Sequence, residues 1–215
     1  MSDAPAALDV HAEAEFELQN AEGAIWTATR LLIGIVTFAW SAVAFAYFYL
    51  RAVDPAQLWR PHGTTPPVLL GTLVALGVVG GALINAYAAP RLRRGETADW
   101  IFATSVTVGL GLLAAGLQVW QLTRLSFFPG VSGYTSVFIG FAGLNIAFIL
   151  GGTYWVETLL ARAIRLRPAL AAEGGPGLST LPAAREFRAS LEGCTYFWWY
   201  MAIISVLFWF LFYVL

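Results

Sequence analysis

The sequence predicts an all-α integral membrane protein, and three observations carry that prediction. Hydrophobic residues make up 59% of the chain and charged residues only 12%, too little charge to cover a soluble domain of this size. The mean hydropathy is +0.69. Apolar runs of about 20 residues, the length that crosses a bilayer as a helix, recur between charged or turn-forming segments. We therefore expect a bundle of five transmembrane helices.

The first span is the run from Leu31 to Leu50, which lies between Arg30 and Arg51. Its only ionisable side chains are the phenols of Tyr47 and Tyr49. Twenty residues at about 1.5 Å per residue give about 30 Å of helix, the thickness of one hydrocarbon core. A helix also satisfies its own backbone hydrogen bonds where no water can do so.

The segment before this span, residues 1–24, carries six acidic residues and no basic one. That charge is the reverse of the positive start of a signal peptide, so we expect no cleavage there. A solvated acidic tail is favoured over the alternative, a short helix from Ala12 to Ala24.

The membrane domain is predicted to cover residues 25–215. After the span at 31–50, the expected spans are residues 68–89, 100–123, 134–156 and 193–215. Gly77 and Gly81, in the second of the five, have the spacing that lets two membrane helices approach closely. Residues 168–182 are rich in glycine, proline and alanine and predict a flexible loop.

The arginines predict the orientation. With the N-terminus in the cytoplasm, nine of the twelve arginines face inward, and only Arg51, Arg60 and Arg124 face outward. Positively charged residues are enriched in cytoplasmic loops. The expected orientation is therefore N-terminus in and C-terminus out.

The residue types disfavour several functions. The net charge of −1 gives no basic surface for nucleic acid. Haem and copper need His, Met or Cys ligands, and both histidines, His11 and His62, lie outside the predicted spans. No acidic residue lies near the middle of a span, where a proton carrier would need one. We predict no metal site and no catalytic residue in this chain.

Five polar residues are predicted to make contacts between helices. Gln118 and Gln121 lie one turn apart on one face, near a membrane boundary, where hydrogen bonds to other helices or to headgroups are favoured over ligand binding. Asn85 and Asn145 are expected to hydrogen-bond across helices deep in the membrane. Glu192 is expected to cap the last helix or to pair with Arg188.

The end of the first span carries a family resemblance. The segment from Phe45 to Arg51, followed by Trp59 and Pro61, resembles subunit III of the haem-copper cytochrome c and quinol oxidases. Further similar segments follow in the family's order: the basic turn 91–95, Gly116 to Gln118, Tyr134 to Ser136, Gly140-Phe141, Gly143-Leu144, and Glu192 ahead of Tyr196 and Trp198. The resemblance covers about residues 26–215, and five spans fit the short bacterial form of that subunit.

Several ionisable residues implied by the resemblance are missing. Val36 stands where the family has a buried glutamate, and Ala142 and Asn145 stand where it has two histidines. Gln121 stands in place of a glutamate, and residues 198–202 lack the family's His and Asp. The resemblance therefore implies a divergent member or a paralogue, such as the similar accessory protein of nitric oxide reductase.

The function implied by the resemblance is that of an accessory, non-catalytic subunit of a respiratory terminal oxidase in the bacterial cytoplasmic membrane. Such a subunit would pack against catalytic subunit I and other subunits of a proton-translocating cytochrome c or quinol oxidase. Haem and copper are expected in the catalytic partner and no cofactor in this chain. It would also bind phospholipids, and Tyr47, Arg51 and Trp59 are the candidates for headgroup contact, beside simple interfacial anchoring.

Two other classes of function stay open from the residues alone. A stand-alone transporter or channel would need a water-filled path lined by the polar residues of the spans, which are Asn85, Gln118, Gln121 and Asn145. A membrane enzyme acting on lipid would need a catalytic group, and the sequence suggests none. Within the respiratory class, an accessory subunit of nitric oxide reductase is the alternative to an oxidase subunit.

Overall fold

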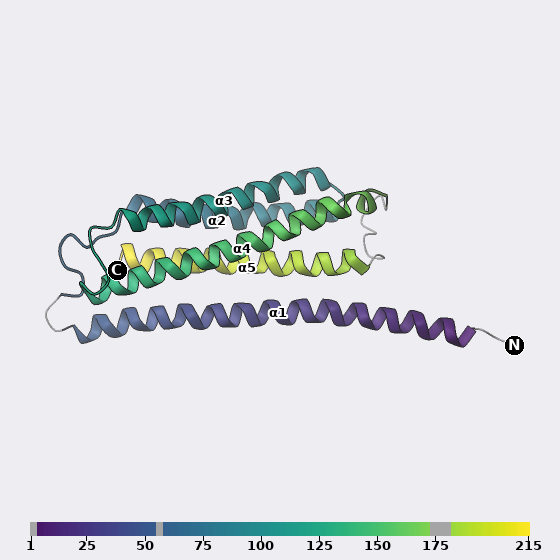
Figure 1. The fold of residues 1–215 in the computed structure, drawn as a ribbon, viewed down its shortest axis with the longest axis horizontal. Helices are drawn as coiled ribbons and strands as arrows, with labels where there is room; N and C mark the ends of the chain where they lie inside the picture. Colours follow the sequence, from purple (N-terminus) through teal and green to yellow (C-terminus); the bar gives the residue numbers. More distant parts are fainter. Residues whose placement is uncertain (1–3, 55–57, 173–181) are drawn as a thin grey trace.

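The computed structural model describes residues 4–54, 58–172 and 182–215. In these ranges all regular structure is helical: α1 (Ala4–Val53), α2 (Val68–Arg93), α3 (Thr97–Thr123), α4 (Gly133–Ala172) and α5 (Pro182–Tyr213). The helices run along one long axis, with the two termini at opposite ends (Figure 1). All five are long and apolar enough to cross a membrane. The predicted all-α class with five such helices is confirmed, and the direction of insertion stays a prediction.

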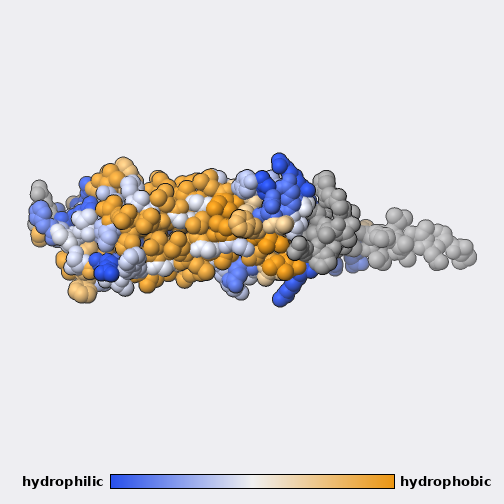
Figure 2. All heavy atoms as spheres, turned by 90° about the horizontal axis from the view of Figure 1, so that it is seen from above, coloured by the Kyte–Doolittle hydropathy of each residue, from blue (hydrophilic) through white to orange (hydrophobic). Residues whose placement is uncertain are grey.

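The surface has the pattern that a bilayer requires. Figure 2 shows a mostly hydrophobic middle on the face in view, with hydrophilic residues gathered toward both ends. Large apolar side chains of the helices are more than half exposed, including Phe38 on α1 and Phe102 on α3. In water such a surface would be unfavourable, whereas in lipid it costs nothing.

The first helix is longer than its predicted span, because α1 begins at Ala4 and contains 50 residues. At about 1.5 Å per residue it is about 75 Å long, more than twice a hydrocarbon core. The acidic segment is thus helical instead of the favoured tail, although Glu13, Glu15 and Glu17 are exposed as expected. Its many Ala and Glu residues are strong helix formers, and a helix that continues an existing one needs no new nucleus.

The predicted loop at residues 168–182 overlaps the ends of two helices. Residues 168–172 form the end of α4, and Pro182 begins α5. Residues 173–181 lie outside the described part of the chain. Pro182 fits the first turn of a helix because the backbone N–H that proline lacks has no partner there in any case.

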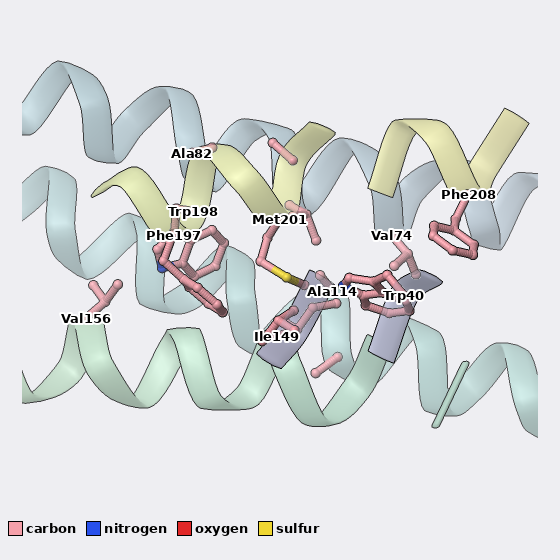
Figure 3. Packing of buried hydrophobic residues seen from close by; sticks show 14 of the residues in the cluster. Trp40, Val74, Ala82, Ala114, Ile149, Val156, Phe197, Trp198, Met201 and Phe208 are labelled. Atoms are coloured by element: carbon pink, nitrogen blue, oxygen red, sulfur yellow. The ribbon is translucent and has the colours of Figure 1, made fainter. Parts of the chain in front are cut away.

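The core lies where α2 to α5 meet, and α1 packs against α4 and α5. Close-packed side chains from all five helices fill it, such as Trp40, Val74, Ala114, Ile149 and Trp198 (Figure 3). Trp198 also donates a hydrogen bond from Nε1 to the carbonyl oxygen of Gly152, at 3.3 Å. The contact joins α5 to α4.

Glycines set the close approaches between helices, but Gly77 and Gly81 do not form one seam. A Cβ on Gly77 would lie 3.1 Å from Cβ of Ala114 on α3, whereas a Cβ on Gly81 would lie 2.9 Å from the ring of Trp198 on α5. Gly77 therefore lets α2 approach α3, and Gly81 lets α2 approach α5. The predicted close approach is present at each of them, but with two partner helices instead of one.

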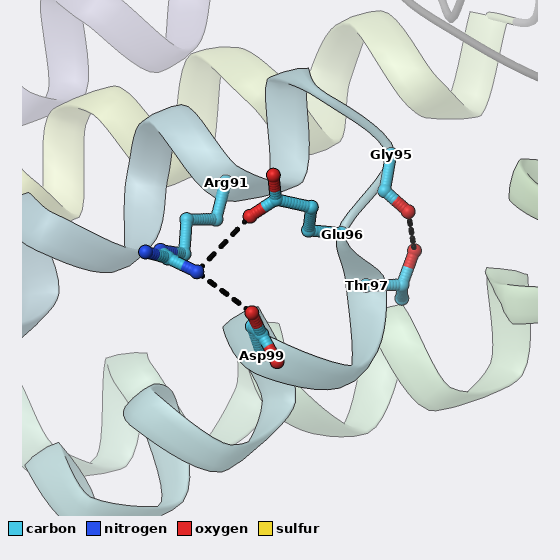
Figure 4. A network of polar contacts seen from close by, with 5 residues as sticks. All are labelled: Arg91, Gly95, Glu96, Thr97 and Asp99. Atoms are coloured by element: carbon cyan, nitrogen blue, oxygen red, sulfur yellow. Dashed lines mark hydrogen bonds and ion pairs between the residues drawn. The ribbon is translucent and has the colours of Figure 1, made fainter.

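A tight turn joins α2 to α3. Gly95 has φ = 80°, a left-handed conformation that favours glycine. Nη1 of Arg91 lies 3.1 Å from a carboxylate oxygen of Glu96 and 2.7 Å from one of Asp99 (Figure 4). The guanidinium also lies 4.4 Å from the ring centroid of Tyr87. These contacts hold the end of α2 against the start of α3.

Candidate functional site

The most extensive buried polar feature of the described residues is a row of amides, which we call the amide network. Asn145 donates from Nδ2 to Oε1 of Gln118, at 3.0 Å, and Gln118 donates from Nε2 to Oε1 of Gln121, at 2.6 Å. Gln121 donates from Nε2 to the carbonyl oxygen of Pro67, at 2.9 Å, and to the hydroxyl of Tyr213, at 2.5 Å. The network ties α3 to α4, to α5 and to the residue before α2.

The burial of these amides decides between the contacts that the sequence allowed. Gln118, Gln121 and Asn145 are at most 2% exposed, so their partners are helices and not lipid headgroups. Hydrogen bonds of this kind hold membrane helices in a fixed register. Asn85 is also buried, on α2, but it is outside the network, and its Nδ2 donates no hydrogen bond to the described residues.

Glu192 lies inside α5, ten residues after its start at Pro182, so it does not cap the helix as proposed. It is half-buried and lines a polar pocket between α1 and α5, together with Glu22, Trp26 and Arg188. Both Glu192 and Arg188 line this pocket, and the expected contact between them stays a prediction. The pocket places it between two helices.

At the other end of α1, an aromatic cluster replaces the predicted headgroup contact of Tyr47. Tyr47 is 1% exposed and makes edge-to-face contacts with Trp59, at 5.0 Å, and Phe212, at 5.5 Å, between ring centroids. Tyr134 joins the cluster through Trp59, at 5.8 Å, and donates from its hydroxyl to the carbonyl oxygen of Phe212, at 2.8 Å. Headgroup contact was expected for Tyr47 from its place at the end of a span, but span boundaries do not reveal which face of a helix is buried.

The two other headgroup candidates occupy different environments. Arg51 is exposed in the last turn of α1. Trp59 is half-buried over Gly133, where a Cβ would come within 2.9 Å of its ring. Arg60 follows, with its guanidinium 4.8 Å from the ring centroid of Tyr134. Of the three candidates, Arg51 is thus the one fully open to the surroundings, and headgroup contact stays a prediction for it.

The interior holds no charged side chain in the described part of the chain. All its buried polar residues are uncharged Thr, Ser, Asn or Gln. Val36 and Ala142, where the resemblance implied a glutamate and a histidine, are both 0% exposed. His62 is exposed in the loop after α1, and the described residues contain no group of three or more His, Cys, Asp or Glu that could hold a metal ion. This arrangement can bind helices together through uncharged hydrogen bonds.

No family model matches the chain. Over 143 residues it is 32% identical to cytochrome c oxidase subunit 3 of Branchiostoma lanceolatum, and equally to that of Branchiostoma floridae, covering 59% of this chain and 53% of each relative. It is 27% identical over 146 residues to cytochrome c oxidase subunit 3 of Strongylocentrotus purpuratus, covering 61% of this chain and 55% of that one. The chain is thus similar, over about three fifths of its length, to proteins named cytochrome c oxidase subunit 3. It spans about half the length of these curated relatives.

Sequence reasoning missed the role of Trp40. Its ring centroid lies 5.6 Å from that of Phe141, 5.3 Å from Phe148 and 5.1 Å from Phe208, so one side chain joins α1 to α4 and α5. Its size and its position in the middle of a span were the available signals, but they do not distinguish a packed aromatic side chain from a lipid-exposed one such as Phe38. The partners themselves are distant in sequence and could not be inferred.

Proposed function

We propose that this chain is an accessory, non-catalytic membrane subunit of a haem-copper respiratory oxidase. The similarity to three proteins named cytochrome c oxidase subunit 3 carries the proposal. The uncharged interior supports it, because a redox or proton-carrying centre would need ligands or titratable groups. In this proposal the catalytic partner holds haem and copper, and this chain contributes stability.

The polar residues support a structural role over a transporter. A water-filled path would expose Gln118, Gln121 and Asn145 to water, whereas they are buried and hydrogen-bonded to one another. Amides that satisfy each other across helices stabilise a packed bundle. Within the respiratory class, the relatives named as cytochrome c oxidase subunits favour an oxidase over a nitric oxide reductase.

The outward face of α1 is the contact surface that we assign to the catalytic partner. The residues Leu31, Ile35, Phe38, Phe45 and Phe48 are each more than half exposed. Their spacing of three, four or seven residues places them along one stripe of the helix. Only 17% of the most apolar part of α1 is buried, against 39–44% in the other four helices. Helix α1 is thus the helix least covered by the other four, so it has the most surface available for a partner.

Lipid binding is proposed for the groove between α1 and α5. This groove has a volume of about 370 Å³, and its walls are mainly apolar, such as Ala44, Ile204 and Leu207. At one side the hydroxyl of Thr37 lies 2.9 Å from that of Tyr200. An acyl chain matches such walls, because most of their surface is apolar.

Removal of this chain from its native membrane tests the non-catalytic, stabilising role. The remaining oxidase should still reduce oxygen, but its activity should decline faster during continuous turnover than that of the complete complex. Oxygen consumption over many turnovers measures both quantities. An unchanged rate of decline would contradict the stabilising role, and immediate loss of activity in a fully assembled catalytic subunit would contradict the non-catalytic one.

A further inference from the structure

A small cavity adjoins the amide network between helices α2 to α5. Its walls include Val74 of α2 and Phe141 of α4, and its polar lining includes Gln118, Asn145 and Ser205. The cavity leaves about 10 Å³ for the centre of a water-sized sphere, which is about what a single bound water needs. It therefore has room for one water molecule and for no larger ligand.

Two polar atoms on this cavity have no hydrogen-bond partner among the described residues: Oδ1 of Asn145 and Oγ of Ser205. The two side chains are 2% and 4% exposed. They come from different helices, α4 and α5. A buried polar group without a partner costs about 1–3 kcal/mol, and lipid offers no substitute for water as a partner.

The hydrogen bonds of the amide network determine how the side-chain amide of Asn145 is oriented. The carbonyl of Pro67 can only accept, so the group that Gln121 presents to it must be its N–H. Oε1 of Gln121 is then an acceptor for Nε2 of Gln118, and Oε1 of Gln118 is an acceptor for Nδ2 of Asn145. Each amide orientation follows from the one before it. Oδ1 of Asn145 is consequently left as an acceptor that needs a donor.

We propose that one water molecule binds in this cavity, donating to Oδ1 of Asn145 and hydrogen-bonding to the hydroxyl of Ser205. The water extends the amide network to Ser205 of α5. Three helices, α3, α4 and α5, and the residue before α2 are then joined by uncharged hydrogen bonds within the membrane domain. The inference is independent of the proposed function, because it concerns only the interior of this chain.

An experimental structure of the full chain, at a resolution that shows ordered water, tests the site directly. The expected result is density within hydrogen-bonding distance of both Oδ1 of Asn145 and Oγ of Ser205. A map that shows other buried waters but no density here would overturn the proposal. A direct hydrogen bond between Asn145 and Ser205 would overturn it as well.

Thermal unfolding gives a second, independent test. Ser205→Ala removes one partner of the water and should lower the unfolding midpoint by about 2–4 °C. Ser105→Ala is the matched control, since Ser105 is exposed and its hydroxyl already bonds to the carbonyl of Ile101, at 2.8 Å. In the Asn145→Leu background, Ser205→Ala should lower the unfolding midpoint by less than it does in the unmodified protein. The reason is that the water has already lost its acceptor on Asn145. Equal effects of the two serine variants, or strict additivity with Asn145→Leu, would contradict the site.

Discussion

Helix α1 and the group α2 to α5 are held in place by different kinds of contact. Within the group, helices approach closely at glycines such as Gly111 and are joined by the amide network. Helix α1 lies along one side of the bundle (Figure 1) and is fixed chiefly by large aromatic side chains such as Trp40 and Tyr47, with one close approach where Gly193 of α5 meets Thr29. Truncation of an aromatic residue should therefore loosen α1, whereas enlargement of a small residue should disrupt the group.

The largest effect is expected from Trp40→Ala. Trp40 is 2% exposed, and its truncation leaves a cavity among Phe141, Phe148 and Phe208. The free energy of unfolding should fall by about 3 kcal/mol or more. Phe38→Ala is the control on the same helix, since Phe38 is 79% exposed and should cost less than about 0.5 kcal/mol. Chemical unfolding of the purified variants measures both. Similar losses would show that α1 is not anchored through Trp40.

A smaller but clear effect is expected from Gly111→Leu. A Cβ at this position would overlap with the side chain of Thr153 on α4, so α3 and α4 must move apart. This overpacking should lower the free energy of unfolding by about 1–3 kcal/mol. Gly109→Leu is the matched control, because nothing lies within 4 Å of a Cβ there. The two variants should differ in unfolding midpoint by several degrees. If Gly109→Leu is as harmful, helix propensity or lipid contact would explain the loss instead of packing.

Gln118→Leu should lower the free energy of unfolding somewhat less, by about 0.6–2 kcal/mol, the range found for interhelical hydrogen bonds in membranes. It leaves Nδ2 of Asn145 and Oε1 of Gln121 without their partner. A double-mutant cycle with Asn145→Leu measures the coupling, and the double variant should lose less than the sum of the two single ones. Additive losses would mean that the two amides do not interact.

The smallest effect is expected at the protruding end of α1, where Nη1 of Arg185 lies 2.7 Å from a carboxylate oxygen of Glu15. Both side chains are solvent-accessible, and water and salt screen such pairs. Glu15→Gln should shift the unfolding midpoint by less than about 1 °C. A larger shift that vanishes in high salt would mean that this contact anchors α1, and the aromatic account of its anchoring would then be incomplete.

The fold class was predictable because the need for backbone hydrogen bonds in lipid leaves few solutions for apolar runs of 20 residues or more. The ends of the helices were not, since α1 continues to Ala4 through residues that are compatible with both a helix and a tail. The packing partners of side chains could not be predicted from the sequence either. Tyr47 was a candidate for headgroup contact, whereas it is buried against Trp59 and Phe212. Helix packing brings together residues whose separation in sequence carries no signal.

Parts of the polar site were predictable and parts were not. The spacing of Gln118 and Gln121 shows that they share one face, but their connection to Asn145 and Pro67 depends on how α3, α4 and the loop before α2 meet. Glu192 was assigned to the start of a helix that begins ten residues earlier. The position of a cap follows from the first helical residue, which composition places poorly.

Purification from native membranes through a C-terminal tag, followed by a reduced-minus-oxidised spectrum, tests whether this chain is a subunit of a haem-copper oxidase. A haem protein should co-purify with it. The haem yield should fall for Phe38→Ala/Phe45→Ala, on the outward face of α1, and stay unchanged for Leu112→Ala/Leu113→Ala, on the exposed surface of α3. A folded, tagged protein that carries no haem protein with it would contradict the proposal.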